Sequence, residues 1–420
     1  FDLEAMFDGE VYSDFVLLWL FGHATRFAAR EENKPESCFL EQWTKLAEEQ
    51  GTRALESLRD GVQEALQILG QGFVGHPKNT ALREVLRTGQ LSLSDFHGEL
   101  LRVVYRFIFL FVAEDRRLDN LPLIHPRDPS VAGRLARERY AAFYGTRRLR
   151  DMAARIRGSR HGDLWRQFQM VVGALSGSDS TSAMRQHLAL PALGSLLWNP
   201  ASTVHLNAPC DCGPGTEIAN CDLLDALRRL AFTRQEKVLR PVDYANLGAE
   251  ELGGVYEGLL AMTPQLSGDG ASFTFAEFAG NERKTSGSYY TPDCLVQRLL
   301  DSALDPVVEG AVAGKAWEEA ERAILGLKVC DPAVGSGHFL VGSAHRLARH
   351  LARIRARVAG ESEPSPIQYQ HALRDVIGRC LYGVDINPMS AELCRVGLWL
   401  EALEPGKPLS FLDRHISVGN

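Results

Sequence analysis

DPAVGSGHFL, residues 331–340, follows the short apolar run 327–330 and precedes a helical pattern in 339–358. Gly335 and Gly337 allow a tight turn and a close backbone approach to a ligand, and the following helix offers unpaired N–H groups. A dinucleotide-binding loop would carry a third glycine three residues after Gly337, where Leu340 stands. The acid before the loop, Asp331, instead suits a ligand with a positively charged amino group.

Two more apolar runs, 380–384 and 416–418, follow along the chain, with helical patterns in 339–358 and 389–403 between the three runs. An extra helical segment around 367–377 lengthens the first crossover. Strand, helix, strand, helix, strand predicts the first half of a doubly wound, Rossmann-like parallel sheet, which makes this part of the chain α/β. Ligands of such sheets bind at the carboxyl ends of the strands.

The second strand is expected to end at Asp385, where a carboxylate can accept hydrogen bonds from both hydroxyls of a ribose. Asn387 is a good N-cap and Pro388 a good first helical residue, so the turn is predicted to aim Asp385 at the crevice. Upstream, Thr291 is expected to cap a helix over 295–304 and to leave amides for a ligand carboxylate. A ligand with an amino group, a ribose and a carboxylate is an amino-acid nucleoside, so the three sites together predict that such a ligand binds here. The alternative is that these segments are turns between strands and helices that hold no ligand.

The segments GSYYTP (287–292), DPAVGSGHFL and YGVDINP (382–388) resemble motifs X, I and II of the gamma class of amino-group DNA methyltransferases, in the order of that class. The resemblance covers residues 285–420 and implies adenine N6 methylation of DNA with S-adenosylmethionine. By this resemblance the cofactor-binding residues are Tyr289, Tyr290, Thr291, Pro292, Asp331, Pro332, Ala333, Gly335, Ser336, Gly337, Phe339, Asp385, Ile386 and Asn420. Asn420 is included because of its place in the third motif.

The catalytic signature of that class, Asn/Asp-Pro-Pro-Tyr/Phe, is absent. The two Asn-Pro pairs, at Asn199 and Asn387, lack the second proline. The signature holds the target amine and stacks on the flipped base, so no catalytic residue is predicted in this chain. Glu282-Arg283-Lys284 has the letters of a nuclease motif without an acid-bearing strand before it, and is rejected. His338 is interpreted as a helix-start residue because amino methylation needs no such base.

The helical front also resembles, more loosely, the large bacterial methylases of Type IIG restriction-modification and of phage defence, PglX-like in BREX or of the DISARM kind. This implies double-stranded DNA and other subunits of a defence system as partners. An alternative from another class is a module that senses S-adenosylmethionine and switches a defence complex without methylating. A protein or RNA methyltransferase of the same class is a further alternative.

The composition of the chain limits which classes of protein it can belong to. The chain has 420 residues, 45% of them hydrophobic, and a net charge of −7. Its beginning at Phe1 is interpreted as a sign of a longer polypeptide. Apolar runs too short for a bilayer and eight irregularly spaced cysteines favour a cytoplasmic protein without membrane contact. Residues 1–175 are predicted to form a helical domain, with Phe107, Phe109 and Phe111 in its core, and 176–284 a loop-rich connector with a helical lead-in.

Two clusters remain open. Nine arginines and two acids lie between 131 and 160, which indicates a solvated helical face or domain contact, with DNA phosphate contact as the less favoured alternative. His205, Cys210, Cys212 and Cys221 look like metal ligands, but Cys-x-Cys is tighter than the usual zinc spacing, so no metal is expected. Cys330 and Cys380 are predicted to be buried in strands as small apolar residues.

Overall fold

The computed structural model describes residues 6, 12–31, 34–118, 120–208, 215–235, 238–248, 253, 262–267, 270, 272–276, 291, 293–402 and 410–420. It divides into two compact units, residues 1–57 and 58–420. None of the helices in these ranges is long and apolar enough to cross a membrane.

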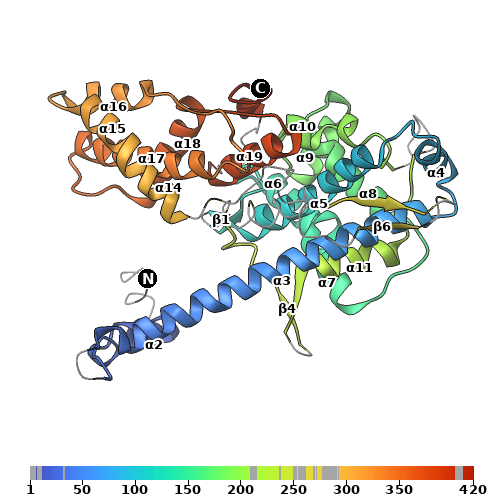
Figure 1. The fold of residues 1–420 in the computed structure, drawn as a ribbon, viewed down its shortest axis with the longest axis horizontal. Coiled ribbons are helices and arrows are strands. Elements are labelled where there is room, and N and C mark those ends of the chain that lie inside the picture. Colours follow the sequence, from blue (N-terminus) through green and yellow to red (C-terminus); the bar gives the residue numbers. More distant parts are fainter. Residues whose placement is uncertain are drawn as a thin grey trace. The chain divides into compact units, whose positions relative to one another are not determined.

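The first unit is helical. It contains α2 (Tyr12–Gly22), the short 3-10 turns η1 (Ala24–Arg26) and η2 (Pro35–Ser37), and the first part of α3 (Phe39–Gly75), which continues into the second unit (Figure 1). Large apolar side chains are exposed on α2, among them Tyr12, Val16 and Trp19.

Most elements of the second unit up to Ala231 are also helices, and we call residues 58–231 the helical part. After α3 they are α4 (Thr80–Arg87), α5 (Leu93–Asp115), α6 (Val131–Arg139), the π-turn η3 (Tyr140–Tyr144), α7 (Thr146–Arg155), α8 (Asp163–Leu175), η4 (Asp179–Thr181), α9 (Ser182–Leu188), α10 (Ser195–Trp198), η5 (Pro200–Thr203) and α11 (Asn220–Ala231). The longest of these helices are α3 and α5.

The core of this helical part is α5. Ser92 caps its first turn by accepting a hydrogen bond from the Asp95 N–H at 3.0 Å, and seventeen of its residues are buried. Phe107, Phe109 and Phe111 are almost completely buried, which confirms them as core residues. The ring of Phe107 stacks on Phe168 of α8 with centroids 3.9 Å apart. Apolar burial of this extent is the main stabilising term of the fold.

Three antiparallel pairs of short strands escaped the sequence prediction. They are β1 (Arg117–Leu118) with β2 (Leu121–Pro122), β3 (Phe232–Gln235) with β4 (Val238–Pro241), and β5 (Pro264–Leu266) with β6 (Phe273–Phe275). Strands of two to four residues are too short to show an alternating pattern.

A three-stranded parallel sheet begins after α14 (Asp293–Leu299), the π-turn η6 (Leu300–Leu304), α15 (Asp305–Val312) and α16 (Trp317–Gly326). Its strands are β7 (Val329–Asp331), β8 (Leu381–Asp385) and β9 (Ile416–Val418), in the order β7-β8-β9. Asp331 pairs with Gly383, and Asp385 with Val418. The expected runs thus form strands that pair in parallel.

Helices join the three strands. In the sequence, α17 (His338–Val358) and α18 (Pro366–Arg379) connect β7 to β8, and the two helices pack against each other (Figure 1). α19 (Pro388–Glu401) and the 3-10 turn η7 (Ser410–Arg414) connect β8 to β9. The extra helix expected around 367–377 is therefore α18. Ser365 and Gln368 form a capping box at its start, which fixes where the helix begins.

The prediction for Cys330 was wrong. Its side chain is exposed, whereas Cys380 is buried as expected, although it lies one residue before β8. Exposure alternates along β7, with Val329 and Asp331 half-buried and Cys330 exposed, so the Cys330 side chain lies on a face of the strand that the described residues leave uncovered.

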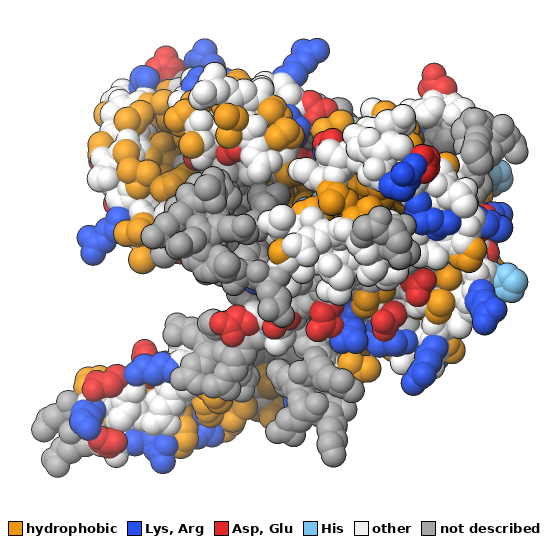
Figure 2. All heavy atoms as spheres, turned by 45° about the vertical axis from the view of Figure 1, so that its right-hand side comes forward, with side chains coloured by type: hydrophobic (Ala, Val, Ile, Leu, Met, Phe, Trp, Pro, Cys, Tyr) orange, Lys and Arg blue, Asp and Glu red, His pale blue; other side chains and the backbone are white. Residues whose placement is uncertain are grey.

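Charges of both signs are mixed on the surface. On the face shown in Figure 2, acidic and basic side chains lie near one another with hydrophobic side chains among them.

Candidate functional site

Asp331 and two glycines shape the turn after β7, and we call residues 332–337 the glycine loop. The Asp331 carboxylate accepts a hydrogen bond from the Ala333 N–H at 3.0 Å, which turns the chain directly after the strand. Gly335 and Gly337 have φ of 54° and 96°, a region that favours glycine. The Gly337 N–H then donates to the Val334 carbonyl at 2.8 Å, so the turn closes where α17 begins.

Gly337 is required for a second reason, which is space. A Cβ at this position would lie 2.8 Å from Cys394 Sγ. Cys394 is fully buried on α19, so the loop and this helix are in direct contact. A larger residue would push the loop away from α19.

Asp385 joins the ends of neighbouring strands. Its Oδ2 accepts a hydrogen bond from the Gly335 N–H at 2.9 Å, and its Oδ1 accepts one from the Asn387 N–H at 2.8 Å. Its backbone carbonyl accepts a hydrogen bond from the Gly419 N–H at 2.9 Å. The glycine loop, the turn after β8 and the residue after β9 therefore meet at one residue.

The start of α19 is built as predicted. Asn387 Oδ1 accepts a hydrogen bond from the Met389 N–H at 2.9 Å, and Pro388 is the first helical residue. Ile386, between Asp385 and this cap, is 74% exposed. The cap thus fixes the backbone on the far side of Asp385.

Two carboxylates share this edge of the sheet. Burial raises the pKa of the Asp331 carboxyl; the hydrogen bond from Ala333 opposes that rise, and the charge of Asp385 adds to it. Because the charge of Asp385 disfavours the charged form of Asp331, a ligand that brings a positive charge or several donors to this edge would be favoured.

The other predicted cofactor residues surround this centre. Ser336 is buried, Phe339 is half-buried on the first turn of α17, and Pro332, Ala333 and Asn420 are exposed. Thr291 is half-buried, whereas Tyr289, Tyr290 and Pro292 lie outside the described residues, so the N-cap role of Thr291 stays a prediction.

α14, the helix after Thr291, packs tightly on α17. A Cβ at Gly342 of α17 would lie 2.9 Å from Val296 and 3.1 Å from Leu300. Gly342 lies about one turn after the glycine loop, so the contact holds α14 against the amino-terminal half of α17.

One residue near the loop was missed. A Cβ at Gly253 would lie 2.9 Å from Ser336 Oγ, so Gly253 lies directly against the glycine loop. The pair Gly253-Gly254 within a helical pattern was the available signal, because glycine inside a helix is unfavourable unless something packs closely there.

The helical part holds α19 in place through buried polar and aromatic contacts. Arg102 Nε lies 3.2 Å from Glu392 Oε2, and the Glu392 side chain is only 2% exposed. Arg116 of the α5 end donates to the Leu400 carbonyl at 3.0 Å, and the rings of Phe109 and Trp399 stack with centroids 4.3 Å apart. The helix that follows Asp385 is therefore supported from α5.

His205, the first residue of the cluster with Cys210, Cys212 and Cys221, is held by Glu99. His205 Nδ1 lies 2.7 Å from Glu99 Oε1, and the His205 backbone N–H donates to Glu99 Oε2 at 3.0 Å. Cys221 lies at the start of α11, and Cys210 and Cys212 lie outside the described residues. Within those residues no group of His, Cys, Asp and Glu has the arrangement of a metal site.

Comparison with known proteins finds similarity to DNA methylases. Residues 250–407 match the sequence profile of the N-6 DNA Methylase family. The adenine-specific methyltransferase PglX of Streptomyces coelicolor is 30% identical over 190 residues, which cover 42% of this chain and 14% of that protein. A putative type II restriction enzyme and methyltransferase of Methanocaldococcus jannaschii is 26% identical over 212 residues, 44% of this chain and 16% of that protein.

Among solved structures, the Type IIL restriction-modification enzyme MmeI in complex with DNA aligns with 83% of this chain and 37% of its own, at 16% identity and a TM-score of 0.44. The chain thus corresponds to a minor part of the length of each of these relatives. The resemblance to N-6 adenine DNA methylases of the restriction-modification and defence kind, first indicated by the three motifs, is confirmed by the family match and the two sequence relatives.

Proposed function

We propose that this chain forms the S-adenosylmethionine-binding part of a DNA adenine-N6 methyltransferase in a restriction-modification or phage-defence system. The observation that carries the proposal is the hydrogen bond that joins the glycine loop after β7 to Asp385 at the end of β8. It brings a positive-φ loop and two acids together at the carboxyl edge of a parallel sheet, where nucleotide cofactors of α/β proteins bind. The sheet is then the first half of a Rossmann-like domain.

The residues at this edge fit the cofactor. Asp331 would hold the methionine amino group, because the acid is half-buried and lies directly before the glycine loop. Asp385 would hold the ribose hydroxyls. Each of its carboxylate oxygens accepts one backbone hydrogen bond and keeps a second lone pair for a hydroxyl donor.

The flanking residues complete the cradle in this proposal. Tyr289 to Pro292, before α14, would receive the carboxylate of the cofactor, and Ile386 with Asn420 would flank its adenine. The bound cofactor supplies the methyl group. The residues of this chain bind and orient it, and double-stranded DNA is the proposed substrate of the whole protein, which would act in the cytoplasm with other subunits of the defence system.

The domain organisation follows from the same proposal. Residues 1–175 would be a helical domain, 176–284 a connector, and 285–420 the first half of the methyltransferase domain. The contacts of α5 with α19 support a fixed attachment of the helical part to the cofactor site.

Calorimetric titration with S-adenosylmethionine tests the proposal. A hydrogen bond to a charged group contributes about 1.5–3 kcal/mol, so Asp385→Ala and Asp331→Ala should each weaken binding roughly 10- to 100-fold. Asp413→Ala removes an exposed carboxylate from η7 and serves as the matched control, with wild-type affinity expected. Unchanged affinity in a folded Asp385→Ala protein would overturn the cofactor assignment.

A further inference from the structure

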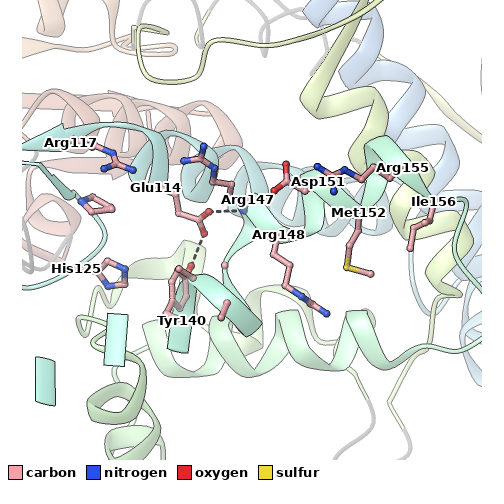
Figure 3. A pocket seen from close by; sticks show the side chains of 14 residues that line it. Glu114, Arg117, His125, Tyr140, Arg147, Arg148, Asp151, Met152, Arg155 and Ile156 are labelled. Carbon is pink, nitrogen blue, oxygen red and sulfur yellow. Dashed lines mark hydrogen bonds between the residues drawn. The ribbon is translucent and has the colours of Figure 1, made fainter. Parts of the chain in front are cut away.

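A pocket with arginines around it lies in the helical part, outside residues 250–407. It has a volume of about 410 Å³ and lies between the end of α5, the β1-β2 hairpin, the π-turn η3 and α7 (Figure 3). Four arginines line it, Arg117, Arg147, Arg148 and Arg155, and we call it the arginine pocket. Its volume is in the range of sites for small organic ligands.

The arginines reach the pocket through the geometry of α7. Arg147, Asp151 and Arg155 are spaced four residues apart and so share one face of the helix. Arg148 and Met152 occupy the neighbouring row, and all five line the pocket. In the view of Figure 3 the side chains of Arg147 and Asp151 extend above the helix and those of Arg148 and Met152 below it, and residues of both rows line the pocket.

Most of this positive charge is not neutralised within the described residues. Arg117, Arg147 and Arg155 make no side-chain hydrogen bond or ion pair there, and Asp151 pairs with neither of its arginine neighbours. Arg148 donates to the Phe143 carbonyl at 3.3 Å and to Gln167 Oε1 at 3.2 Å, which leaves its charge in place. Like charges around a concavity focus a positive potential into it.

The acid of the pocket, Glu114, has a different role. Its carboxylate accepts hydrogen bonds from the Tyr140 hydroxyl at 2.7 Å and from the N–H groups of Thr146 and Arg147 at 2.8 Å each (Figure 3). It thereby caps α7, whose N-cap residue, Gly145, has no side chain to do so. Burial raises the pKa of the Glu114 carboxyl, and the hydrogen bonds from Thr146 and Tyr140 oppose that rise.

The remaining wall is mostly apolar, formed by Pro122, Ala141, Ala142, Met152 and Ile156. His125 also lines the pocket. Burial lowers its pKa to about 4, so the ring is neutral at physiological pH. A positive rim over an apolar wall suits a ligand with a phosphate and a flat, weakly polar body.

We propose that the arginine pocket binds a nucleotide phosphate, with the guanidinium groups of Arg117, Arg147 and Arg155 on the phosphate and the sugar or base against the apolar wall. A DNA strand and a free nucleotide carry the same group, and the experiment distinguishes these two sources. Arg150 takes no part: it pairs with Asp115 at 2.7 and 2.6 Å and lies over the Phe111 ring. The basic stretch is therefore divided between a structural contact and a ligand site.

The test compares two double variants of the full chain. Arg147→Gln with Arg155→Gln changes the pocket and keeps the Arg147 N–H that Glu114 holds. Arg134→Gln with Arg157→Gln removes the same charge from exposed positions that do not line the pocket. Binding of a labelled duplex oligonucleotide and of deoxyadenosine monophosphate is measured for both variants and the wild type, with thermal melting as a check of folding.

The pocket variant should bind one or both probes about 10- to 100-fold more weakly, and the control variant within about 2-fold of the wild type. Weaker binding of the duplex alone, with a salt slope smaller by about 1 for each phosphate that is no longer bound, identifies a DNA strand as the source. Weaker binding of the mononucleotide identifies a free nucleotide. Equal weakening in both variants, or no binding of either probe by the wild type, would overturn the proposal. Cofactor titration of the same variants tests the proposed function separately.

Discussion

The Gly335 N–H donates a hydrogen bond to Asp385 Oδ2 at 2.9 Å, so the residue that ends β8 also holds the loop that follows β7. The same carboxylate caps the turn to α19 through the Asn387 N–H at 2.8 Å. A single side chain thus shapes the proposed cofactor site, in addition to its proposed role in binding the ribose.

This double role gives a prediction for stability. Asp385→Ala leaves two backbone N–H groups without their acceptor, which costs about 1–3 kcal/mol of unfolding free energy when such groups are buried and less at this half-buried site. Urea denaturation should therefore show a decrease of about 1 kcal/mol, whereas Asp413→Ala should stay within about 0.5 kcal/mol of the wild type. Equal stability of Asp385→Ala and wild type would show that these bonds do not hold the loop.

Gly337→Ala should distort the glycine loop through backbone strain and a steric clash. The residue has φ of 96°, and its new Cβ would lie 2.8 Å from Cys394 Sγ. Backbone strain of this kind costs about 1–3 kcal/mol, so the variant should be less stable and bind S-adenosylmethionine more weakly.

Gly310→Ala is the matched control for that substitution. Gly310 lies within α15, and a Cβ there would meet nothing within 4 Å. Its replacement should raise the unfolding free energy by about 0.5–1 kcal/mol, because alanine loses less entropy in a helix. A destabilised Gly310→Ala together with a neutral Gly337→Ala would contradict the loop geometry.

A buried histidine predicts part of the acid sensitivity. Burial lowers the pKa of His97 from 6.5 to about 4. The unfolded chain therefore binds more protons between these values. Burying the neutral His97 ring therefore costs no stability above its pKa in the unfolded chain. Stability is lost as the pH falls from that value toward the pKa of His97 in the folded protein. Between about pH 7.5 and pH 5 this one histidine should cost about 2 kcal/mol of stability.

His97→Phe isolates that contribution. The side chain packs edge-on against Phe275 with ring centroids 5.2 Å apart, so a phenyl ring should fit in its place. Denaturation measured at several pH values should show a flatter profile for His97→Phe than for the wild type. The exposed His161→Gln should leave the profile unchanged. Parallel profiles for His97→Phe and the wild type would reject the titration of His97 as a cause.

The strands and turns of the proposed site were predictable because their signals are local. Apolar runs ending in Asp331 and Asp385, and the Asn387-Pro388 helix start, depend on residues next to one another. The contacts between distant residues were not predictable. Nothing in the sequence around Arg102 indicates that it pairs with Glu392, nor that Phe109 stacks on Trp399.

The arginine-rich stretch over residues 131–160 also has contacts that the sequence does not predict. Its charge was evident from the sequence, but the different roles of its members were not. Arg150 is committed to Asp115 of α5, while Arg147 and Arg155 line a pocket. Periodicity along α7 gives the face of each residue, and the packing of α7 against α5 and α11 determines which face is buried.

The last prediction concerns the reaction itself: the 420-residue chain should bind S-adenosylmethionine and transfer no methyl group to duplex DNA. Neither Asn-Pro pair of the sequence can replace the absent catalytic signature. Asn199 caps η5, and its carbonyl accepts a hydrogen bond from Arg106 at 3.2 Å in the helical part. Asn387 caps α19 through the Met389 N–H.

Without a side chain to orient the target amine, a bound cofactor has no positioned acceptor, and positioning supplies much of the acceleration of such a transfer. Incubation with radiolabelled cofactor and genomic DNA should therefore give no label in DNA, while calorimetry on the same sample detects cofactor binding. A methyltransferase with an intact signature serves as the positive control. Labelled adenine in DNA treated with this chain alone would show that another group of the chain orients the amine, and would refute the assignment of no catalytic residue to this sequence.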